Sequence, residues 1–414
     1  MLDDKERGNS VLGPYRVLDL TDEKGLLCGK ILGDLGADVI KVERPGGDAA
    51  RRLGPFYHNE PNLEKSLFWF AFNTSKRGIT LDIETRSGQD IFRRLVKTSD
   101  FVIESFAPGY LDGLGLGYAD LEKINPRIIV VSITPFGQTG PYRDWKTSDI
   151  VAWAMGGQMA PCGDVDRPPY RVSHHSQSYL NAGVDAAQGA LTALFDLWNT
   201  GEGQQVDVSI QESVVQATEH ITSAWDRRKS IQKRGQELGF RQSQLWRCKD
   251  GYVSFAYSGG GNAVTYNKAF MDWIAREGFT DDSFKDFDGK ALDPLGGEAP
   301  KRIRDLTARF FMAHTKAELL DGALKNEIQL YPVSTPSDIL ENPQLAAREF
   351  WQDIEHSELG ASIRYPGPFV RASDASPRIS RRAPLIGEHN LEIYKGELGI
   401  SEEELLSLTQ AGVI

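Results

Sequence analysis

Cysteine is scarce in this chain of 414 residues. The three cysteines, Cys28, Cys162 and Cys248, are odd in number, lie far apart and show no CxxC spacing. This pattern argues against a disulfide framework and against a zinc site, and we expect no metal site. Cysteines of this kind fit a reducing compartment, so we expect a cytoplasmic protein.

Long apolar runs and an excess of basic residues are also missing. No stretch approaches the roughly 18 apolar residues of a membrane-spanning helix, and the first ten residues, MLDDKERGNS, have no apolar core of a signal peptide. There are 47 Lys and Arg against 58 Asp and Glu, a formal net charge of -11. A general nucleic-acid binder needs a basic surface. We therefore expect neither a membrane nor a nucleic acid as partner, while a local basic pocket for phosphates stays compatible with this charge.

The common nucleotide and hydrolase motifs are absent. The turn after the first expected strand reads Asp22-Glu23-Lys24-Gly25-Leu26-Leu27, with one glycine and two acids. A dinucleotide-binding turn needs G-x-G-x-x-G so that the backbone can approach a pyrophosphate, and acids there repel phosphate. There is also no G-x-x-x-x-G-K-[ST], H-E-x-x-H or G-x-S-x-G motif.

What is present is an alternation of strands and helices. Residues 15–20 read as a buried strand, 25–35 as a helix that Gly36 can end, and 38–43 as a second strand. Such a βαβ unit predicts a parallel sheet, and so an α/β fold. Further strands are expected at 78–82, 101–104, 128–133 and 206–210, with helices at 87–98 and 178–200.

The regular alternation of strands and helices ends near residue 211. We expect one long helix over 211–233, then a smaller α+β domain with strands at 246–248 and 251–257 and helices at 301–312 and 316–325. The glycines at 259–261 indicate a tight turn or a mobile loop. The expected organisation is a large domain over 1–224, a small domain over 225–335 and a return segment, 336–414, that completes the large domain.

Some polar and aromatic residues follow strands, where parallel sheets bind ligands. Arg44 follows the second strand and suits a phosphate, or it is a solvated surface arginine. Phe106 can stack on a ligand ring or anchor a loop in the core. Lys146 can meet a phosphate, although most single lysines do not.

An ordered series of sequence blocks carries a stronger signal. The blocks are VLDL (17–20), LGDLGADVIKVE (32–43), KRGITLD (76–82), FAPGYLD (106–112), FGQTGPY (136–142), TGEGQQVDVS (200–209), PLIGEHN (384–390) and the terminal GVI. In this order they resemble the family III CoA-transferases (CaiB–BaiF, the group of formyl-CoA transferase), over nearly the whole chain. The resemblance implies a Rossmann-like large domain with an inserted smaller domain, an interlocked dimer, and coenzyme A or an acyl-CoA as substrate, with no permanently bound cofactor.

The resemblance also assigns residues. Arg44, Leu81, Ser105, Phe106 and Lys146 match the family's CoA contacts, and Asp149 matches an acid close to the active site. Glu84 and Gly113 stand where formyl-CoA transferase has a lysine and an arginine, so the phosphate pocket must differ in detail.

The departure that matters most lies at the nucleophile. The family aspartate stands four residues before a glycine, which here is Gly183, and that position is Tyr179. A tyrosine cannot form the acyl anhydride of this chemistry, and its ordinary pKa of about 10 makes it a poor nucleophile. Gln177 and Tyr179 can still hydrogen-bond a substrate carboxylate. Asp185 faces another side of the helix, and Glu212 has no predicted place near the site.

The sequence therefore leaves three hypotheses. The first is a subunit of a two-chain CoA-transferase, resembling the E-type subunit of succinyl-CoA:benzylsuccinate CoA-transferases and paired with a homologous chain that carries the aspartate. The second is a homodimeric acyl-CoA lyase or isomerase of the same fold. The third is a non-catalytic scaffold that binds CoA.

Overall fold

The structure is a computed structural model that describes residues 10–163, 166–171, 173, 175–217, 219–231, 244–257, 263–282, 298–375 and 377–414. The chain divides into two compact units, Met1–Ser230 with Arg348–Ile414, and Ile231–Ala347. The boundaries expected from the sequence, 224/225 and 335/336, precede these division points, and the three-part domain assignment stays a prediction. The glycines at 259–261 lie outside the described residues.

The first unit is built on a six-stranded parallel sheet in the order β3-β2-β1-β4-β5-β6. Its strands are β1 (Arg16–Leu20), β2 (Asp38–Glu43), β3 (Lys76–Thr80), β4 (Phe101–Glu104), β5 (Ile129–Thr134) and β6 (Gln205–Ser209). This is the strand order of a doubly wound Rossmann fold, with β1 and β4 at the point where the winding reverses. The predicted Rossmann-like parallel sheet is confirmed.

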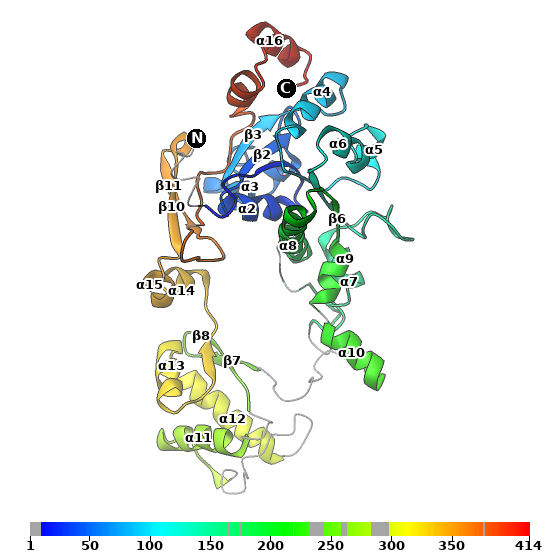
Figure 1. Ribbon diagram of the computed structural model, residues 1–414. Coiled ribbons are helices and arrows are strands. Elements are labelled where there is room, and N and C mark those ends of the chain that lie inside the picture. The colour runs from blue at the N-terminus through cyan, green and yellow to red at the C-terminus, as the bar shows by residue number, and fades with distance from the viewer. Residues whose placement is uncertain are drawn as a thin grey trace. The chain divides into compact units, whose positions relative to one another are not determined.

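The first unit also contains helices and short helical segments. They are α2 (Leu26–Asp34), α3 (Leu67–Asn73), α4 (Arg86–Val96), α5 (Tyr110–Gly113), α6 (Tyr118–Ile124), α7 (Asp149–Met155), α8 (Gln177–Thr200), α9 (Ile210–Gln216), α10 (Glu219–Arg228) and α16 (Glu402–Gln410), with η1 (Ala49–Arg52), η2 (Tyr57–Asn59), η4 (Ser357–Leu359) and η5 (Leu391–Glu397). The hairpin β10 (Trp351–His356) and β11 (Ala361–Pro366) belongs to the same unit (Figure 1).

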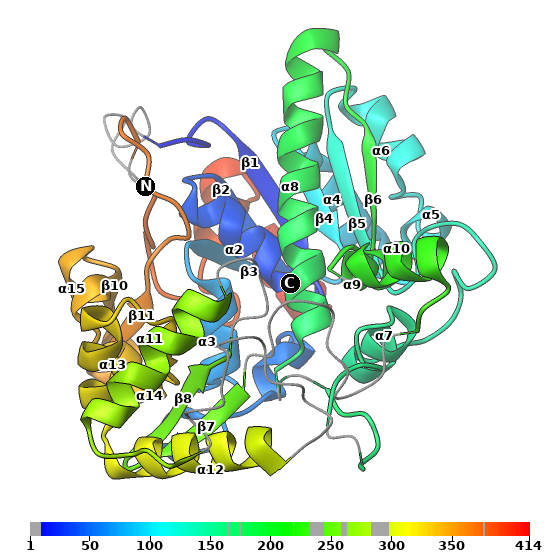
Figure 2. The ribbon, with the colours of Figure 1, turned by 90° about the horizontal axis from the view of Figure 1, so that it is seen from below.

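Alternation along each strand creates two cores, one on each face of the sheet. Val17 on β1 packs with α2 and α8 on one face, whereas its neighbour Leu18 packs with α4, α6 and the C-terminal helices on the other. Figure 2 shows α2 and α8 side by side. A Cβ atom at Gly183 would lie 2.9 Å from Leu27 Cβ, so a glycine at this position lets α8 approach α2 closely.

Gly36 has φ of +101° and ends α2 in the left-handed region, as predicted. The single helix expected over 211–233 is wrong, because α9 ends at Gln216 and a separate helix, α10, begins at Glu219. Residues 232–233 lie outside the described part of the chain. From Arg348 onward the C-terminal segment belongs to the first unit, with Ile393, Tyr394 and Leu405 buried in the same core as Leu18.

The second unit has its own small α+β core. Strands β7 (Gln244–Cys248), β8 (Gly251–Phe255) and β9 (Leu330–Pro332) form an antiparallel sheet. Its helices are α11 (Ala263–Arg276), α12 (Glu298–Ala313), α13 (Lys316–Lys325), α14 (Pro336–Leu340) and α15 (Pro343–Ala347). Buried aromatic residues, among them Phe255, Phe270 and Phe310, form the centre of this core.

A buried ion pair joins β1 to β3. Lys76 Nζ donates to Asp19 Oδ2 at 2.8 Å and to the carbonyl of Leu26 at 2.9 Å, and both charged side chains are fully buried. Removing one partner of a buried pair leaves the other charge buried without its partner, in surroundings that solvate it poorly. We therefore predict that Lys76→Met lowers the free energy of unfolding by about 3–5 kcal/mol, measured by chemical denaturation.

The matched control for this substitution is Lys123→Met. Lys123 is exposed and pairs with Asp120 only one helical turn away. We expect a change of at most about 0.5 kcal/mol there. Equal effects of the two substitutions would show that the buried pair contributes no more than a surface pair.

Candidate functional site

The carboxyl ends of the neighbouring strands β1 and β4 lie at the point where the strand order of the sheet reverses. Ser105 directly follows β4, and its Oγ accepts a hydrogen bond from the backbone N–H of Asp22 at 2.9 Å. The same hydroxyl donates to Asp22 Oδ1 at 2.8 Å. Ser105, expected to contact CoA, therefore holds the loops after β1 and β4 together at the edge where such sheets bind ligands.

Arg44, Phe106 and two further residues form a cluster at the same edge. Arg44 Nη2 donates to Glu84 Oε1 at 2.6 Å and lies 3.1 Å from the Tyr110 hydroxyl, which itself donates to Glu84 at 2.7 Å. The ring of Phe106 stacks on that of Tyr110, with centroids 4.6 Å apart. The structure thus joins two of the expected CoA contacts through Tyr110, which the sequence analysis missed.

Glu84 places a carboxylate beside Arg44 in this cluster. The Arg44 side chain is 61% exposed and that of Glu84 49%, so their ion pair is solvated and contributes little to stability. A phosphate that binds Arg44 has to displace this carboxylate. Because this exposed ion pair is weak, displacing the Glu84 carboxylate from Arg44 costs little free energy.

Leu81 and Lys146 occupy contrasting surroundings. Leu81 is 1% exposed, so its side chain supports the base of the cluster from within the core and offers no free apolar surface. Lys146 is exposed beside an aromatic group formed by Tyr142 and Trp145, whose ring centroids lie 4.1 Å apart. These two aromatic rings beside a lysine were a signal that the sequence analysis did not use.

Asp149 connects the first turns of α7 and α8. Its Oδ1 accepts hydrogen bonds from the backbone N–H of Ser178 at 3.0 Å and from the Ser178 hydroxyl at 2.7 Å. Its Oδ2 is buried without a hydrogen-bond donor and lies 3.8 Å from Arg171 Nη1. A carboxylate between two helix N-termini is stabilised by both helix dipoles.

Tyr179 lies in the first turn of α8 and is 5% exposed. Burial, followed by the charges of Glu23, Asp149 and Asp22, raises the pKa of the Tyr179 phenol well above its ordinary value. The phenol therefore keeps its proton at neutral pH and can donate a hydrogen bond. It cannot replace the nucleophilic carboxylate of the family.

A small pocket opens beside Tyr179. Its walls come from α2, α3, α8, the segment before α8 and the turn after β1, and include Glu23, Leu26, Leu27, Phe68, Phe72, His175, Ser176 and Leu180. Gln177, expected in the substrate pocket, is half-buried and does not line this cavity within the described part of the chain. Neither do Asp185 and Glu212, which the sequence analysis had weighed as substitutes for the aspartate.

Glu23 is the residue that sequence reasoning missed here. The two acids after β1 were used only as evidence against a dinucleotide. Their place after a parallel strand was the signal that could have found Glu23, because ligands bind at that edge. Burial, reinforced by the negative charge of Asp22, raises the pKa of the Glu23 carboxyl.

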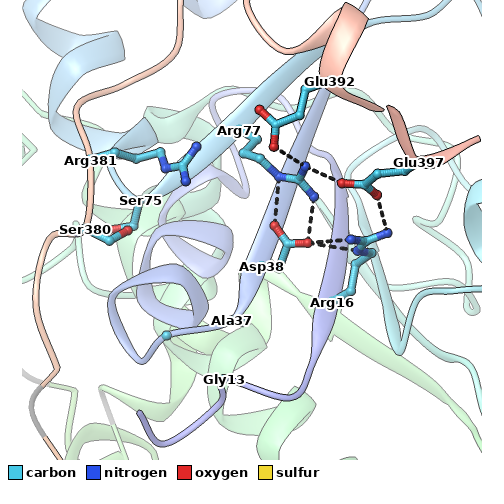
Figure 3. A pocket seen from close by; sticks show the side chains of 11 residues that line it. Gly13, Arg16, Ala37, Asp38, Ser75, Arg77, Ser380, Arg381, Glu392 and Glu397 are labelled. Carbon is cyan, nitrogen blue, oxygen red and sulfur yellow. Dashed lines mark hydrogen bonds and ion pairs between the residues drawn. The ribbon is translucent and has the colours of Figure 1, made fainter. Parts of the chain in front are cut away.

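A second, more polar pocket lies at the opposite edge of the sheet, where the strands begin (Figure 3). Arg77 grips Asp38 with two hydrogen bonds of 2.9 and 2.7 Å and also pairs with Glu392 and Glu397. Arg16 pairs with Asp38 and Glu397 as well. These ion pairs attach the C-terminal segment to β1, β2 and β3, so we assign this pocket a structural role.

Among the described residues, no three His, Cys, Asp or Glu side chains gather in a way that could hold a metal ion. Nor does any helix in these residues have the length and apolar character needed to cross a membrane.

Comparison with known proteins agrees with the sequence blocks. The family model described as CoA-transferase family III matches residues 12–390 of the chain. The chain is 37% identical to the succinyl-CoA:(R)-benzylsuccinate CoA-transferase subunit BbsE of Thauera aromatica, over 97% of each chain. It is 32% identical to the succinyl-CoA–D-citramalate CoA-transferase of Chloroflexus aurantiacus, over 97% of this chain and 98% of the relative.

Solved structures share the fold. A CaiB/BaiF family protein from Brucella suis superposes with a TM-score of 0.79 at 29% identity, over 94% of this chain and 99% of the other. Rv3272 from Mycobacterium tuberculosis superposes with a TM-score of 0.74 at 24% identity, over 92% and 99%.

Glu104, at the carboxyl end of β4, is predicted to make the folding stability depend on pH. Glu104 accepts the Phe106 N–H at 2.7 Å, and burial raises the pKa of its carboxyl from 4.5 to about 7. Below pH 4.5 both the folded and the unfolded chain hold this proton. Between about pH 4.5 and 7 only the folded chain holds it, so folding stability falls by roughly 3 kcal/mol across this window as pH rises.

Glu104→Gln removes this titration while keeping an acceptor for Phe106. We expect the variant to be more stable than the wild type at pH 8 and nearly equal to it at pH 4.5, in urea unfolding curves. A stability difference that is the same at both pH values would contradict the assignment.

Proposed function

Because the chain belongs to CoA-transferase family III, we propose that it is one subunit of a two-chain CoA-transferase. Its partner is a homologous chain that carries the nucleophilic aspartate, and the two chains form the interlocked dimer expected of this family. The observation that supports the proposal is that Tyr179 is a buried phenol that keeps its proton, at the position where we expect the family carboxylate from the sequence blocks.

The proposed reaction moves CoA from one carboxylic acid to another. In the partner's site, an aspartate attacks the thioester of the donor, which releases CoA thiolate and leaves a mixed anhydride. The thiolate then attacks the aspartyl carbonyl of this anhydride, the donor acid leaves, and CoA is held on the enzyme as a thioester. The acceptor acid takes up CoA by the reverse of these steps, which regenerates the aspartate. Succinyl-CoA as donor and an aromatic dicarboxylic acid such as benzylsuccinate as acceptor are proposed from the similarity to BbsE. This chain contributes the scaffold and a CoA-binding edge.

The test compares the chain alone with the chain co-expressed with its homologous partner. Transfer of CoA from succinyl-CoA to benzylsuccinate is followed by chromatography. We expect transfer only from the pair, unchanged by Tyr179→Phe in this chain and abolished by Asp→Asn in the partner. Full transfer by the lone chain, surviving Tyr179→Phe, would refute the two-chain proposal.

A second prediction concerns the CoA-binding edge. If Arg44 binds a CoA phosphate, Arg44→Ala removes a charge-assisted hydrogen bond of about 1.5–3 kcal/mol, which corresponds to a roughly 10- to 100-fold weaker Kd for CoA. Glu84→Gln removes the competing carboxylate, so it should tighten binding severalfold. Isothermal titration calorimetry measures both effects.

The control is Arg93→Ala, which removes the same charge from α4, where the half-buried Arg93 pairs with Asp90 and donates to the Gly115 carbonyl. We expect little change in CoA affinity. If Arg44→Ala and Arg93→Ala behave alike, Arg44 is a solvated surface arginine without a specific contact to CoA.

A further inference from the structure

The pocket at the amino ends of the strands contains polar groups that its structural ion pairs do not use. Its volume is about 330 Å³, which lies in the range of small-molecule sites. Arg16 and Arg77 line it from the strands, whereas Ser380 and Arg381 line it from the segment before η5. Figure 3 shows Arg381 without an ion pair to any of the other residues drawn.

The Arg381 side chain has no hydrogen-bond acceptor among the residues that the structure describes. No carboxylate of these residues pairs with it, and its one polar contact is His389 Nε2, 3.1 Å from Nη1. Gly78 N–H donates to His389 Nδ1 at 3.1 Å, so the proton of the neutral imidazole is on Nε2. Burial lowers the pKa of His389, which keeps the ring neutral at pH 7. Two N–H donors therefore face each other, and neither satisfies the other.

An anion would relieve this arrangement. Arg381 is half-buried, and burial, together with the positive charge of Arg77, lowers the pKa of its guanidinium. A carboxylate matches a planar guanidinium through two parallel charge-assisted hydrogen bonds. The Ser380 hydroxyl, which has no partner within the described part of the chain, supplies a further donor beside Arg381.

The ion pairs of the same pocket leave one negative charge in excess. Asp38, Glu392 and Glu397 carry three carboxylates against the two guanidinium groups of Arg16 and Arg77. Glu392 Oε1 accepts from Arg77 at 2.9 Å, but its Oε2 has no donor in the residues described, and the side chain is 39% exposed. This excess repels a ligand with several negative charges, whereas an ammonium group can donate to Glu392.

We propose that this pocket binds a small zwitterion with one carboxylate and one ammonium group, the chemistry of an amino acid. The ligand carboxylate pairs with Arg381 and accepts from the Ser380 hydroxyl, and the ligand ammonium donates to Glu392. Because the pocket lies at the edge of the sheet opposite to Arg44, this binding site goes beyond the proposed CoA transfer and does not depend on it. The pocket has this role in addition to its structural one.

The test is isothermal titration calorimetry of the full-length chain at pH 7 with ω-amino acids from glycine to 6-aminohexanoate. Each is compared with the carboxylate and the alkylamine of the same chain length, and with inorganic phosphate. We expect one amino acid to bind at least about tenfold more tightly than its matched carboxylate, its matched amine or phosphate, because it makes two charge-assisted contacts. It should also raise the melting temperature, since it binds only the folded chain.

Two results would overturn the proposal. One is the absence of binding by every amino acid of the series. The other is binding of the matched carboxylate or of phosphate that equals that of the best amino acid, because the excess carboxylate would then contribute nothing to recognition.

Three variants assign the contacts. Arg381→Gln should weaken the Kd of the amino acid roughly 10- to 100-fold, as loss of a charge-assisted hydrogen bond does. Arg381→Lys should restore only part of the affinity, because lysine lacks the planar fork. Glu392→Gln should weaken binding of the amino acid but not of its matched carboxylate. Wild-type affinity in Arg381→Gln would refute the site.

The matched control is Arg371→Gln, which makes the same substitution at an exposed arginine that does not line the pocket. The Kd should stay unchanged there, and equal weakening in Arg371→Gln and Arg381→Gln would contradict a specific contact. Arg381→Gln should keep the melting temperature of the free chain, because no ion pair among the described residues is lost. CoA transfer by the two-chain enzyme is a separate assay, so failure of one proposal leaves the other standing.

Discussion

The ion pair between Asp19 and Lys76 is the constraint on which the site depends, because it fixes the turn that carries the site's acids. Asp19 Oδ1 accepts hydrogen bonds from the backbone N–H of Thr21 at 3.0 Å and from its hydroxyl at 2.7 Å. Lys76 Nζ reaches Asp19 Oδ2 and the Leu26 carbonyl in the first turn of α2. The chain between Thr21 and Leu26 is thus held at both ends, and Asp22 and Glu23 lie between them.

The energetics of this pair explain why it determines structure so strongly. Two buried charges lose their hydration, and only close contact with each other and with further polar groups offsets that loss. Although burial by itself would raise it, the pKa of Asp19 is held below its usual value by Lys76 and Lys41. Such a pair tolerates little displacement of β1, β2 or β3, so the edge of the sheet is rigid where ligands are expected to bind.

The sequence blocks predict the family nucleophile in the first turn of α8, at the position of Tyr179, a buried phenol that keeps its proton. The carboxylates have not vanished, because Glu23 and Asp149 approach the same place from the turn after β1 and from α7.

Much of the fold could be predicted from local patterns. The parallel strands are short apolar runs bounded by turn residues, and Gly36 adopts the left-handed conformation that its position after α2 requires. The hairpin β10–β11 was missed, because its alternating exposed and half-buried residues carry a weak apolar signal. The break between α9 and α10 was missed because both segments have helical periodicity.

The candidate site was predicted only in part, for reasons of geometry. Arg44, Ser105, Phe106 and Asp149 could be named because each occupies a recognisable sequence block or follows a strand. Tyr110, Glu84 and Glu23 could not, because their importance comes from neighbours far along the chain, such as Glu84 for Arg44 and Tyr179 for Glu23.

By itself, therefore, the sequence determined the family and the parallel sheet, both of which depend on residue identity and local spacing, and it predicts Tyr179 at the position of the family aspartate. Only the tertiary structure decided which carboxylates face Tyr179, that Glu84 is paired with Arg44, and that Leu81 is enclosed in the core. The physical reason is that burial and electrostatic interaction depend on distance in space, and residues 23 and 179 become neighbours only when the β1–α2 turn and α8 pack together.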